Sequence, residues 1–170
     1  MRAAPGFSSA AETATAAVGL AIEKHLTVAT AESLTAGMVA AALANTPGAS
    51  GMLQGGVVAY QNSVKAAVLG VSRDLLDSVG SVDGQVAAAM AAGARLACGA
   101  DVGVSTTGVA GPEPHDGKEV GTVFIGIATE SGSESFEYAF SGDRQYIRDQ
   151  ACSGALVRLL AVLGDLGYRS

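Results

Sequence analysis

Ser33 and Lys65 are the two residues whose types and surroundings suggest catalysis. Ser33 lies in the stretch TVATAESLTAGMVAAAL (residues 27–43), where a short apolar run ends in polar residues before a helical pattern begins. A serine at such a junction either caps the helix or acts as a nucleophile in front of free N–H groups that stabilise an oxyanion. In the second case, residues 34–37 would supply the N–H donors.

A serine nucleophile needs a base. The two histidines, His25 and His115, are expected at a helix end and in a loop, so a Ser-His-Asp triad is not expected and a Ser-Lys pair is the alternative. Lys65, in the stretch AYQNSVKAAVLG, has apolar neighbours, and burial would lower its pKa from the ordinary value of about 10.4. The competing interpretation is a surface lysine extending from an amphipathic helix. Lys24 is expected to be a solvated charge at a helix end, and Lys118 to lie in a loop.

Further polar residues could complete a site around this pair. Tyr60 precedes Lys65 at a strand end and either contacts the site or lies at the edge of the core. Thr107, just before Gly108, could donate its hydroxyl to a ligand or cap a loop. Arg144 and Arg148 are one helical turn apart and share a face. Guanidinium groups suit bidentate phosphate binding, although these two could also pair with neighbouring aspartates.

The elements that must position these residues alternate between strand and helix. Strands are expected at residues 26–31, 55–60, 100–105, 120–129 and 134–140. Helices are expected at residues 10–25, 35–44, 62–69 and 83–98, with a turn or two at 72–78 and a last helix capped by Asp143. This order predicts a three-layer α/β/α sandwich with a mixed, mostly parallel sheet. Ligands bind at the carboxyl ends of the strands in such sheets, where the polar turns after Ala31 and Ser105 lie.

Composition narrows the class of protein. The 170 residues fit one domain spanning 1–170, with residues 1–9 expected to form a flexible tail. The net charge of −6 argues against a nucleic-acid partner, and the longest apolar runs are too short for a transmembrane helix. Cys98 and Cys152 have no CxxC spacing, which favours free thiols in the cytoplasm over a zinc site, with a single disulfide as the open alternative.

Five stretches occur in the order found in the CinA C-terminal domain family, which this chain resembles from about residue 10 to 165. They are AESLTAG, GGVVAYQNSVKAAVLGV, GVSTTGVAGP, GTVFIGIAT and FSGDRQYIRDQA. Stand-alone members of the family include nicotinamide mononucleotide (NMN) deamidases. The resemblance implies an α/β/α fold and hydrolysis of the NMN amide to nicotinate mononucleotide and ammonia. It implies no metal and no cofactor, a pyridine nucleotide as the small-molecule substrate, and a possible homodimer.

The resemblance also implies roles for individual residues. Ser33 matches the family's serine nucleophile, Lys65 its lysine base and Tyr60 the tyrosine of the same motif. Between the two arginines, it favours Arg148 as the functional one, while Arg144 stays possible. The expected substrate-binding residues are Thr35, Ala36, Gly37, Thr107, Gly108, Arg144 and Arg148. Glu32 is expected to point away from the substrate, toward a backbone donor or a basic residue.

The sequence departs from the family pattern in two places. Residues 113–119 read EPHDGKE where many relatives have a glycine-rich stretch, which could alter substrate preference. Leu34 and Ala36 stand where relatives often have Cys and Gly. Two alternatives to NMN deamidation stay open at this point. One is a non-catalytic nucleotide-binding or interaction module linked to competence or DNA damage, and the other is an amidase for a different pyridine or nucleotide amide.

Overall fold

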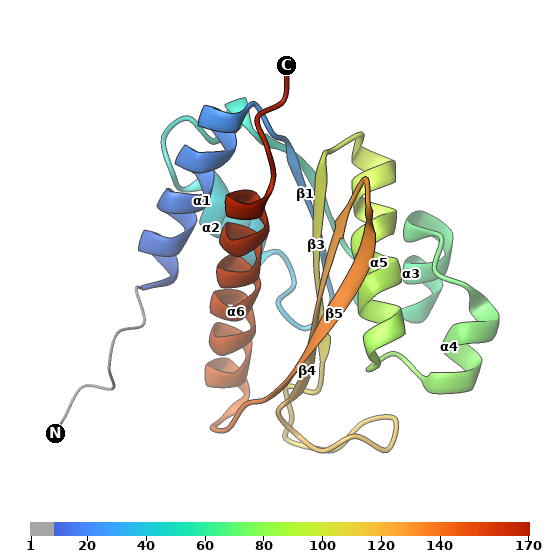
Figure 1. Cartoon of the computed structure of the whole chain (residues 1–170). Helices are drawn as coiled ribbons and strands as arrows, with labels where there is room; N and C mark the ends of the chain where they lie inside the picture. Colours follow the sequence, from blue (N-terminus) through green and yellow to red (C-terminus); the bar gives the residue numbers. More distant parts are fainter. Residues whose placement is uncertain (1–8) are drawn as a thin grey trace, which may run out of the picture.

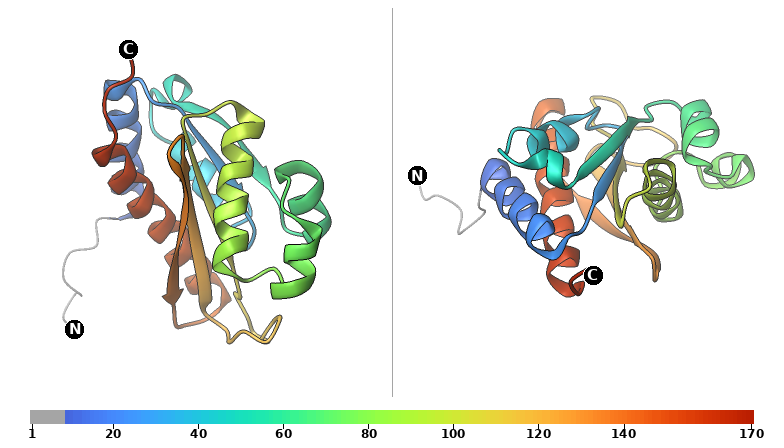
Figure 2. Two further views of the ribbon diagram at one scale, coloured as in Figure 1. Left: turned by 45° about the vertical axis from the view of Figure 1, so that its right-hand side comes forward. Right: turned by 90° about the horizontal axis from the view of Figure 1, so that it is seen from above.

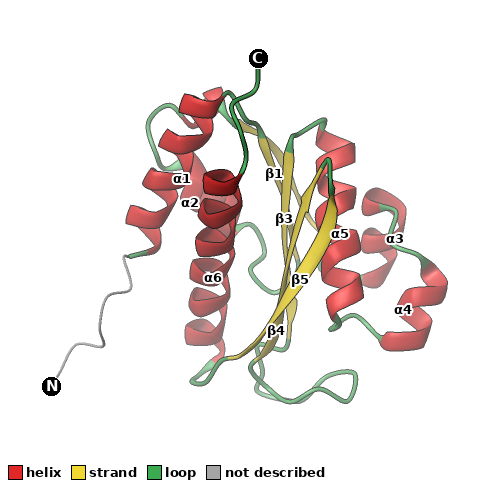
Figure 3. Cartoon of the chain, viewed as in Figure 1, coloured by secondary structure: helices red, strands yellow, loops and turns green. Residues whose placement is uncertain are grey.

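A five-stranded sheet separates two layers of helices in the computed structural model, which describes residues 9–170 (Figures 1 and 3). The strands are β1 (Val28–Glu32), β2 (Leu53–Val58), β3 (Val102–Gly108), β4 (Thr122–Thr129) and β5 (Gly132–Ala139). Their spatial order is β2-β1-β3-β4-β5. Strand β1 pairs in parallel with β2 and β3, while β4 is antiparallel to both β3 and β5. Among these strands only β4 runs opposite to the others, so the mixed, mostly parallel sheet is confirmed.

The helices divide between the two faces of the sheet (Figure 2). One face is covered by α1 (Ala10–Lys24), α2 (Met38–Ala44) and α6 (Arg144–Asp165). The other carries α3 (Asn62–Leu69), α4 (Arg73–Val79) and α5 (Gly84–Cys98), and a short 3₁₀ helix, η1 (Ala49–Gly51), precedes β2. Within residues 9–170, no helix has the length and apolar character needed to cross a bilayer. The three-layer sandwich expected from the sequence is therefore confirmed.

Two element boundaries differ from the sequence expectation near the polar turns. Strand β3 continues beyond Ser105 to Gly108, because Thr106 and Thr107 keep pairing with β4. Helix α2 begins at Met38 and not at Thr35, since residues 33–37 form a tight turn in which Ala36 and Gly37 have positive φ angles of 49° and 100°. The threonines expected in a loop therefore belong to a strand.

Two polar residues near the ends of α1 have structural roles that the sequence did not indicate. Ser9 was assigned to the tail, yet it caps α1 by accepting a hydrogen bond from the N–H of Glu12; residues 1–8 lie outside the described part. The expectation that Lys24 is solvated was wrong. Its side chain is buried, and Nζ donates to the backbone oxygens of three residues at the end of α6, namely Leu163, Gly164 and Leu166. A cation is favourable at a helix C-terminus.

Helix α5 lies unusually close to the sheet. A Cβ atom at Gly103 in β3 would overlap the carbonyl oxygen of Ala91, and one at Gly126 in β4 would overlap that of Ala87. Both carbonyls belong to α5, so the two glycines set the distance between this helix and the strands. On the opposite face, larger apolar side chains such as Leu156 fill the space beneath α6.

Gly103→Ala should lower the free energy of unfolding by about 1–3 kcal/mol, because the added methyl group forces the backbone of β3 away from that of α5. Gly19→Ala is the matched control, since nothing lies within 4 Å of a Cβ at that position in α1. The control should gain up to about 1 kcal/mol from the higher helix propensity of alanine. Urea unfolding monitored by circular dichroism measures both, and equal effects at the two positions would contradict the packing argument.

Candidate active site

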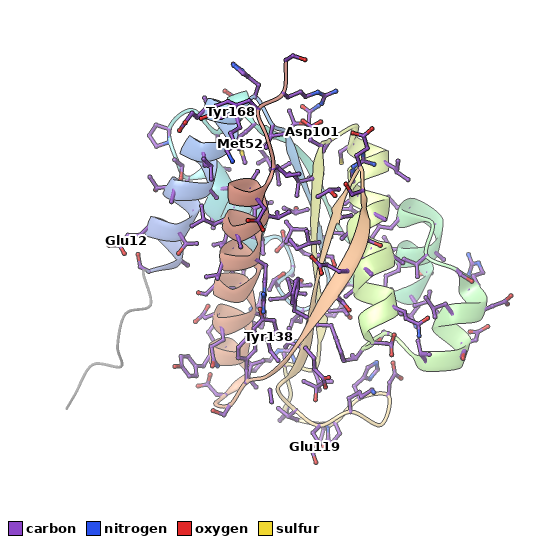
Figure 4. All side chains as sticks on the ribbon, in the orientation of Figure 1. Glu12, Met52, Asp101, Glu119, Tyr138 and Tyr168 are labelled. Atoms are coloured by element: carbon purple, nitrogen blue, oxygen red, sulfur yellow. The ribbon has the colours of Figure 1, made fainter. Side chains whose placement is uncertain are left out.

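A pocket of about 290 Å³ opens at the carboxyl ends of β1, β2 and β3. This volume is at the small end of the usual range for ligand pockets, roughly 300–1,000 Å³. In Figure 4, Glu119 marks the loop at this end of the sheet, whereas Asp101 and Tyr168 lie at the opposite end. The lining residues are Ser33, Leu34, Tyr60, Ser81, Thr107, Gly108, Val109, Ala110, Gly111, Pro112, Glu113, Pro114, His115 and Arg144.

Ser33 and Lys65 touch at one wall of this pocket. The Nζ atom of Lys65 lies 3.1 Å from Oγ of Ser33 and also donates to the carbonyl oxygens of Ala59 and Tyr60, at 2.8 and 3.2 Å. Lys65 has no exposed surface, whereas Ser33 lines the pocket. Lys65 is therefore not a surface lysine. Ser33 is not a helix cap either, because the N-cap of α2 is Gly37.

The surroundings of Lys65 favour its neutral form. Burial lowers the pKa of Lys65 to about 8, although the negative charge of Asp116 acts in the opposite direction. A neutral amine has two N–H groups and one lone pair. The carbonyl oxygens of Ala59 and Tyr60 can accept both N–H groups, which leaves the lone pair for the hydroxyl proton of Ser33. This arrangement is the one that a lysine base requires.

The carboxylate of Glu32 occupies the N-terminus of α2. Glu32 is buried, and its oxygens accept hydrogen bonds from the N–H groups of Val39 and Ala40 at 2.8 and 3.1 Å. The expectation that this helix end faces the substrate was therefore wrong, because a negative charge already satisfies its donors. Glu32 does point toward backbone donors, as expected.

The expected substrate-binding residues Thr35, Ala36 and Gly37 do not line the pocket. The hydroxyl of Thr35 is buried between Glu32 and Thr106, at 2.7 Å from each. The N–H of Ala36 donates to the carbonyl of Ser33 and so closes the tight turn. These residues belong to the tight turn that follows Ser33, because α2 starts three residues later than expected.

Other backbone donors remain free at the pocket wall. Within residues 9–170, no protein acceptor lies in hydrogen-bonding geometry to the N–H groups of Leu34, Ala110 and Gly111. Leu34 directly follows Ser33, and the other two belong to the turn after β3. Unpaired backbone donors at a pocket are suited to an oxyanion or a phosphate.

Arg144, rather than Arg148, faces the pocket, which corrects the preference for Arg148. The guanidinium of Arg144 donates to the carbonyl of Gly111 and to the hydroxyl of Tyr60, the latter at 2.9 Å. Arg148 lies one turn further along α6, outside the pocket lining, and its Nε donates to the carbonyl of Leu34 at 2.8 Å. It thus contacts the tight turn that follows Ser33.

Of the remaining expected residues, Thr107 and Gly108 do line the pocket. The hydroxyl of Thr107 already donates to the carbonyl of Ser81 at 2.6 Å. Sequence reasoning missed Ser81, and it placed His115 in a loop without recognising that this loop forms a pocket wall. The only sequence signal was the departure from the family pattern at residues 113–119.

Comparison with known proteins identifies the family. The CinA C-terminal domain matches residues 10–163. The chain belongs to this family. It is 44% identical over 149 residues to a CinA-like protein of Frankia casuarinae, covering 88% of this chain and 34% of the relative. It is 41% identical over 141 residues to a putative competence-damage inducible protein of Bacillus subtilis, covering 83% and 34%. The chain thus spans about a third of the length of these relatives.

Solved structures of the family match almost the whole chain. The competence/damage inducible protein CihA from Agrobacterium tumefaciens superposes with a TM-score of 0.87 at 34% identity, over 96% of this chain and 99% of that one. A CinA superfamily protein from Klebsiella pneumoniae gives a TM-score of 0.89 at 29% identity, over 94% and 100%. These names describe competence and damage response and state no reaction.

The free energy of unfolding should rise between pH 8 and 10.5 because of Lys65. In this window the folded chain has lost the proton that the unfolded chain still binds, so raising the pH favours folding. The gain is up to about 3 kcal/mol at ~1.4 kcal/mol per pH unit. Urea unfolding of wild type and Lys65→Met across this range isolates the contribution. Parallel stability curves for the two proteins would contradict the lowered pKa.

Proposed function

We propose that the protein hydrolyses the carboxamide of NMN to nicotinate mononucleotide and ammonia, with Ser33 as nucleophile and Lys65 as base. The observation that carries the proposal is the 3.1 Å contact between a fully buried lysine amine and a serine hydroxyl at a pocket wall. A binding module has no need for this pair, and burying the amine costs free energy. The resemblance to NMN deamidases supplies the substrate.

The reaction balances with the groups at the site. Neutral Lys65 takes the proton of Ser33 while Oγ bonds to the amide carbon, and the carbonyl becomes an oxyanion. The N–H of Leu34 is the donor nearest in sequence to stabilise this charge, since the N–H of Ser33 itself donates to Thr106. When the C–N bond breaks, Lys65 gives its proton to the departing ammonia. Water, deprotonated by Lys65, then hydrolyses the ester and releases the carboxylate and Ser33.

The phosphate of the substrate fits the other end of the pocket. Arg144 supplies a positive charge there, and the free N–H groups of Ala110 and Gly111 lie in the adjacent turn. An anion site needs such local donors in a chain of net charge −6. Tyr60, held by Arg144 through its hydroxyl, would contact the substrate between phosphate and amide.

Ser33→Ala and Lys65→Met should each reduce ammonia release from NMN by at least about 10³-fold, because each removes one partner of the proton transfer. Wild-type kcat/KM should rise with pH around a midpoint near 8, where Lys65 becomes neutral. Ser78→Ala, on the exposed face of α4, is the control and should keep full activity. Circular dichroism verifies that all variants are folded, and a folded Ser33→Ala protein with wild-type turnover would refute the scheme.

Arg144→Gln should raise the KM for NMN by about tenfold or more, because it removes one charged hydrogen bond to the phosphate. Activity on nicotinamide riboside, which lacks the phosphate, should change much less. Arg73→Gln in the exposed first turn of α4 controls for net charge. Equal losses on both substrates would show that Arg144 does not bind the phosphate.

The same assay separates the alternatives. NMN that binds without ammonia release from wild type would favour a non-catalytic nucleotide-binding module, in keeping with the competence and damage names of the relatives. Ammonia release from another pyridine or nucleotide amide, but not from NMN, would favour an amidase of different specificity. Isothermal titration alongside the ammonia assay covers both outcomes.

A further inference from the structure

The loop of residues 112–119 lies at the pocket and is held by its own hydrogen bonds. Four of its residues, from Pro112 to His115, line the pocket. The backbones of His115 and Lys118 exchange two hydrogen bonds, at 3.2 and 2.8 Å. Asp116, at the turn between them, has a left-handed φ of 49°, which aspartate and asparagine tolerate better than most side chains.

Asp116 fastens this loop to the segment between α4 and α5. Its Oδ2 atom accepts two hydrogen bonds from Ser81, one from the N–H and one from the hydroxyl, both at 2.8 Å. The neighbouring Gly80 makes room for this contact, because a Cβ there would lie 2.8–2.9 Å from the Asp116 side chain. The two segments therefore meet through a specific, close contact.

The contact extends to the floor of the pocket. The carbonyl of Ser81 accepts a hydrogen bond from Thr107 at the end of β3, and both residues line the pocket beside Ser33. We propose that Asp116 is a positioning residue, which holds loop 112–119 against Ser81 and so sets both the pocket wall and the electrostatic surroundings of Lys65. The inference rests on the proposed amidase function for its effect on turnover, but not for its effect on the loop.

The charges around Asp116 support this role. The two bonds from Ser81 lower the pKa of Asp116, so the carboxylate is ionised at neutral pH. Nε2 of His115 lies 3.4 Å from Oδ2 of Asp116. The charge of Asp116 raises the pKa of Lys65, against the effect of burial. Glu113 and Arg144 are the other charged residues at this pocket, and Lys118 lies on the same loop. Removing the charge while keeping the loop closed should therefore lower the pKa of Lys65.

Two substitutions separate the loop from the charge. Asp116→Asn keeps an oxygen that can accept from Ser81 and tolerates the left-handed backbone, but it lacks the charge. Asp116→Ala loses both hydrogen bonds from Ser81. Asp77→Asn, at an exposed position of α4, is the matched control. All three are tested as the full chain, with unfolding curves to confirm folding.

Two readouts need no substrate. Trypsin cleavage after Lys118, followed by mass spectrometry, should accelerate at least about tenfold in Asp116→Ala and stay near wild type in Asp77→Asn. The titration of Lys65, followed by NMR of ¹³C-labelled lysine, should shift to lower pH in Asp116→Asn. If wild type turns over NMN, Asp116→Ala should raise KM more than it lowers kcat, and the pH midpoint of Asp116→Asn should move down with Lys65.

The outcomes are separable. Unchanged cleavage in Asp116→Ala, or an unchanged or raised Lys65 midpoint in Asp116→Asn, overturns the inference. Faster cleavage together with a lowered midpoint supports it, even if no ammonia is released from NMN by wild type. The absence of ammonia release from NMN by wild type would count against the proposed function alone.

Discussion

The burial of the Lys65 amine is the constraint on which the rest of the site depends. An amine without exposed surface must find acceptors, or it destabilises the fold. The chain supplies them where β2 ends, because the carbonyls of Ala59 and Tyr60 turn toward Nζ before α3 begins. Lys65 lies on α3, whose direction brings Nζ back to these two carbonyls. The third hydrogen-bond partner of Nζ is Oγ of Ser33. The three-residue link between β2 and α3 thus fixes the position of Lys65 relative to Ser33.

The carboxylate of Glu32, next to Ser33 in the chain, is a second buried polar group at the site. Glu32 is the last residue of β1, and its carboxylate joins the first turn of α2 to the hydroxyl of Thr35. Thr35 in turn contacts Thr106 on β3. Among the described residues, no buried side-chain nitrogen or oxygen lacks a hydrogen-bond partner. A fully satisfied network of this kind is rigid, and it holds the Ser33 turn against two strands.

The sequence predicted the layers, and singled out Ser33 and Lys65, better than it predicted the contacts of the surrounding polar residues. The alternating strand and helix patterns, and the two consecutive strands at 120–129 and 134–140, are local signals, so the α/β/α sandwich followed from them directly. Ser33 and Lys65 stood out because a polar residue at a strand end and a lysine among apolar neighbours are locally unusual. Whether they touch depended on the pairing of β1 with β2, which no local pattern encodes.

The errors have a common physical origin in tertiary contacts. Lys24 looked solvated because its acceptors, at the end of α6, lie about 140 residues further along the chain. Thr35 was expected to bind substrate at the start of α2, but the carboxylate of Glu32, which lies before the turn in the sequence, accepts the N–H groups there. Ser81 carried no local signal at all, since its meaning comes from Asp116 and Thr107.

Helix α6 connects the parts of the site that the sheet alone leaves independent. At its first residue, Arg144 contacts both Tyr60 after β2 and Gly111 after β3. One turn later, Arg148 contacts Leu34 after β1. Two arginines on one helical face therefore reach the carboxyl ends of β1, β2 and β3, and of the two only Arg144 lines the pocket. Because one helix carries both arginines, a shift of α6 would move the contacts at Tyr60 and Gly111 together with the contact at Leu34.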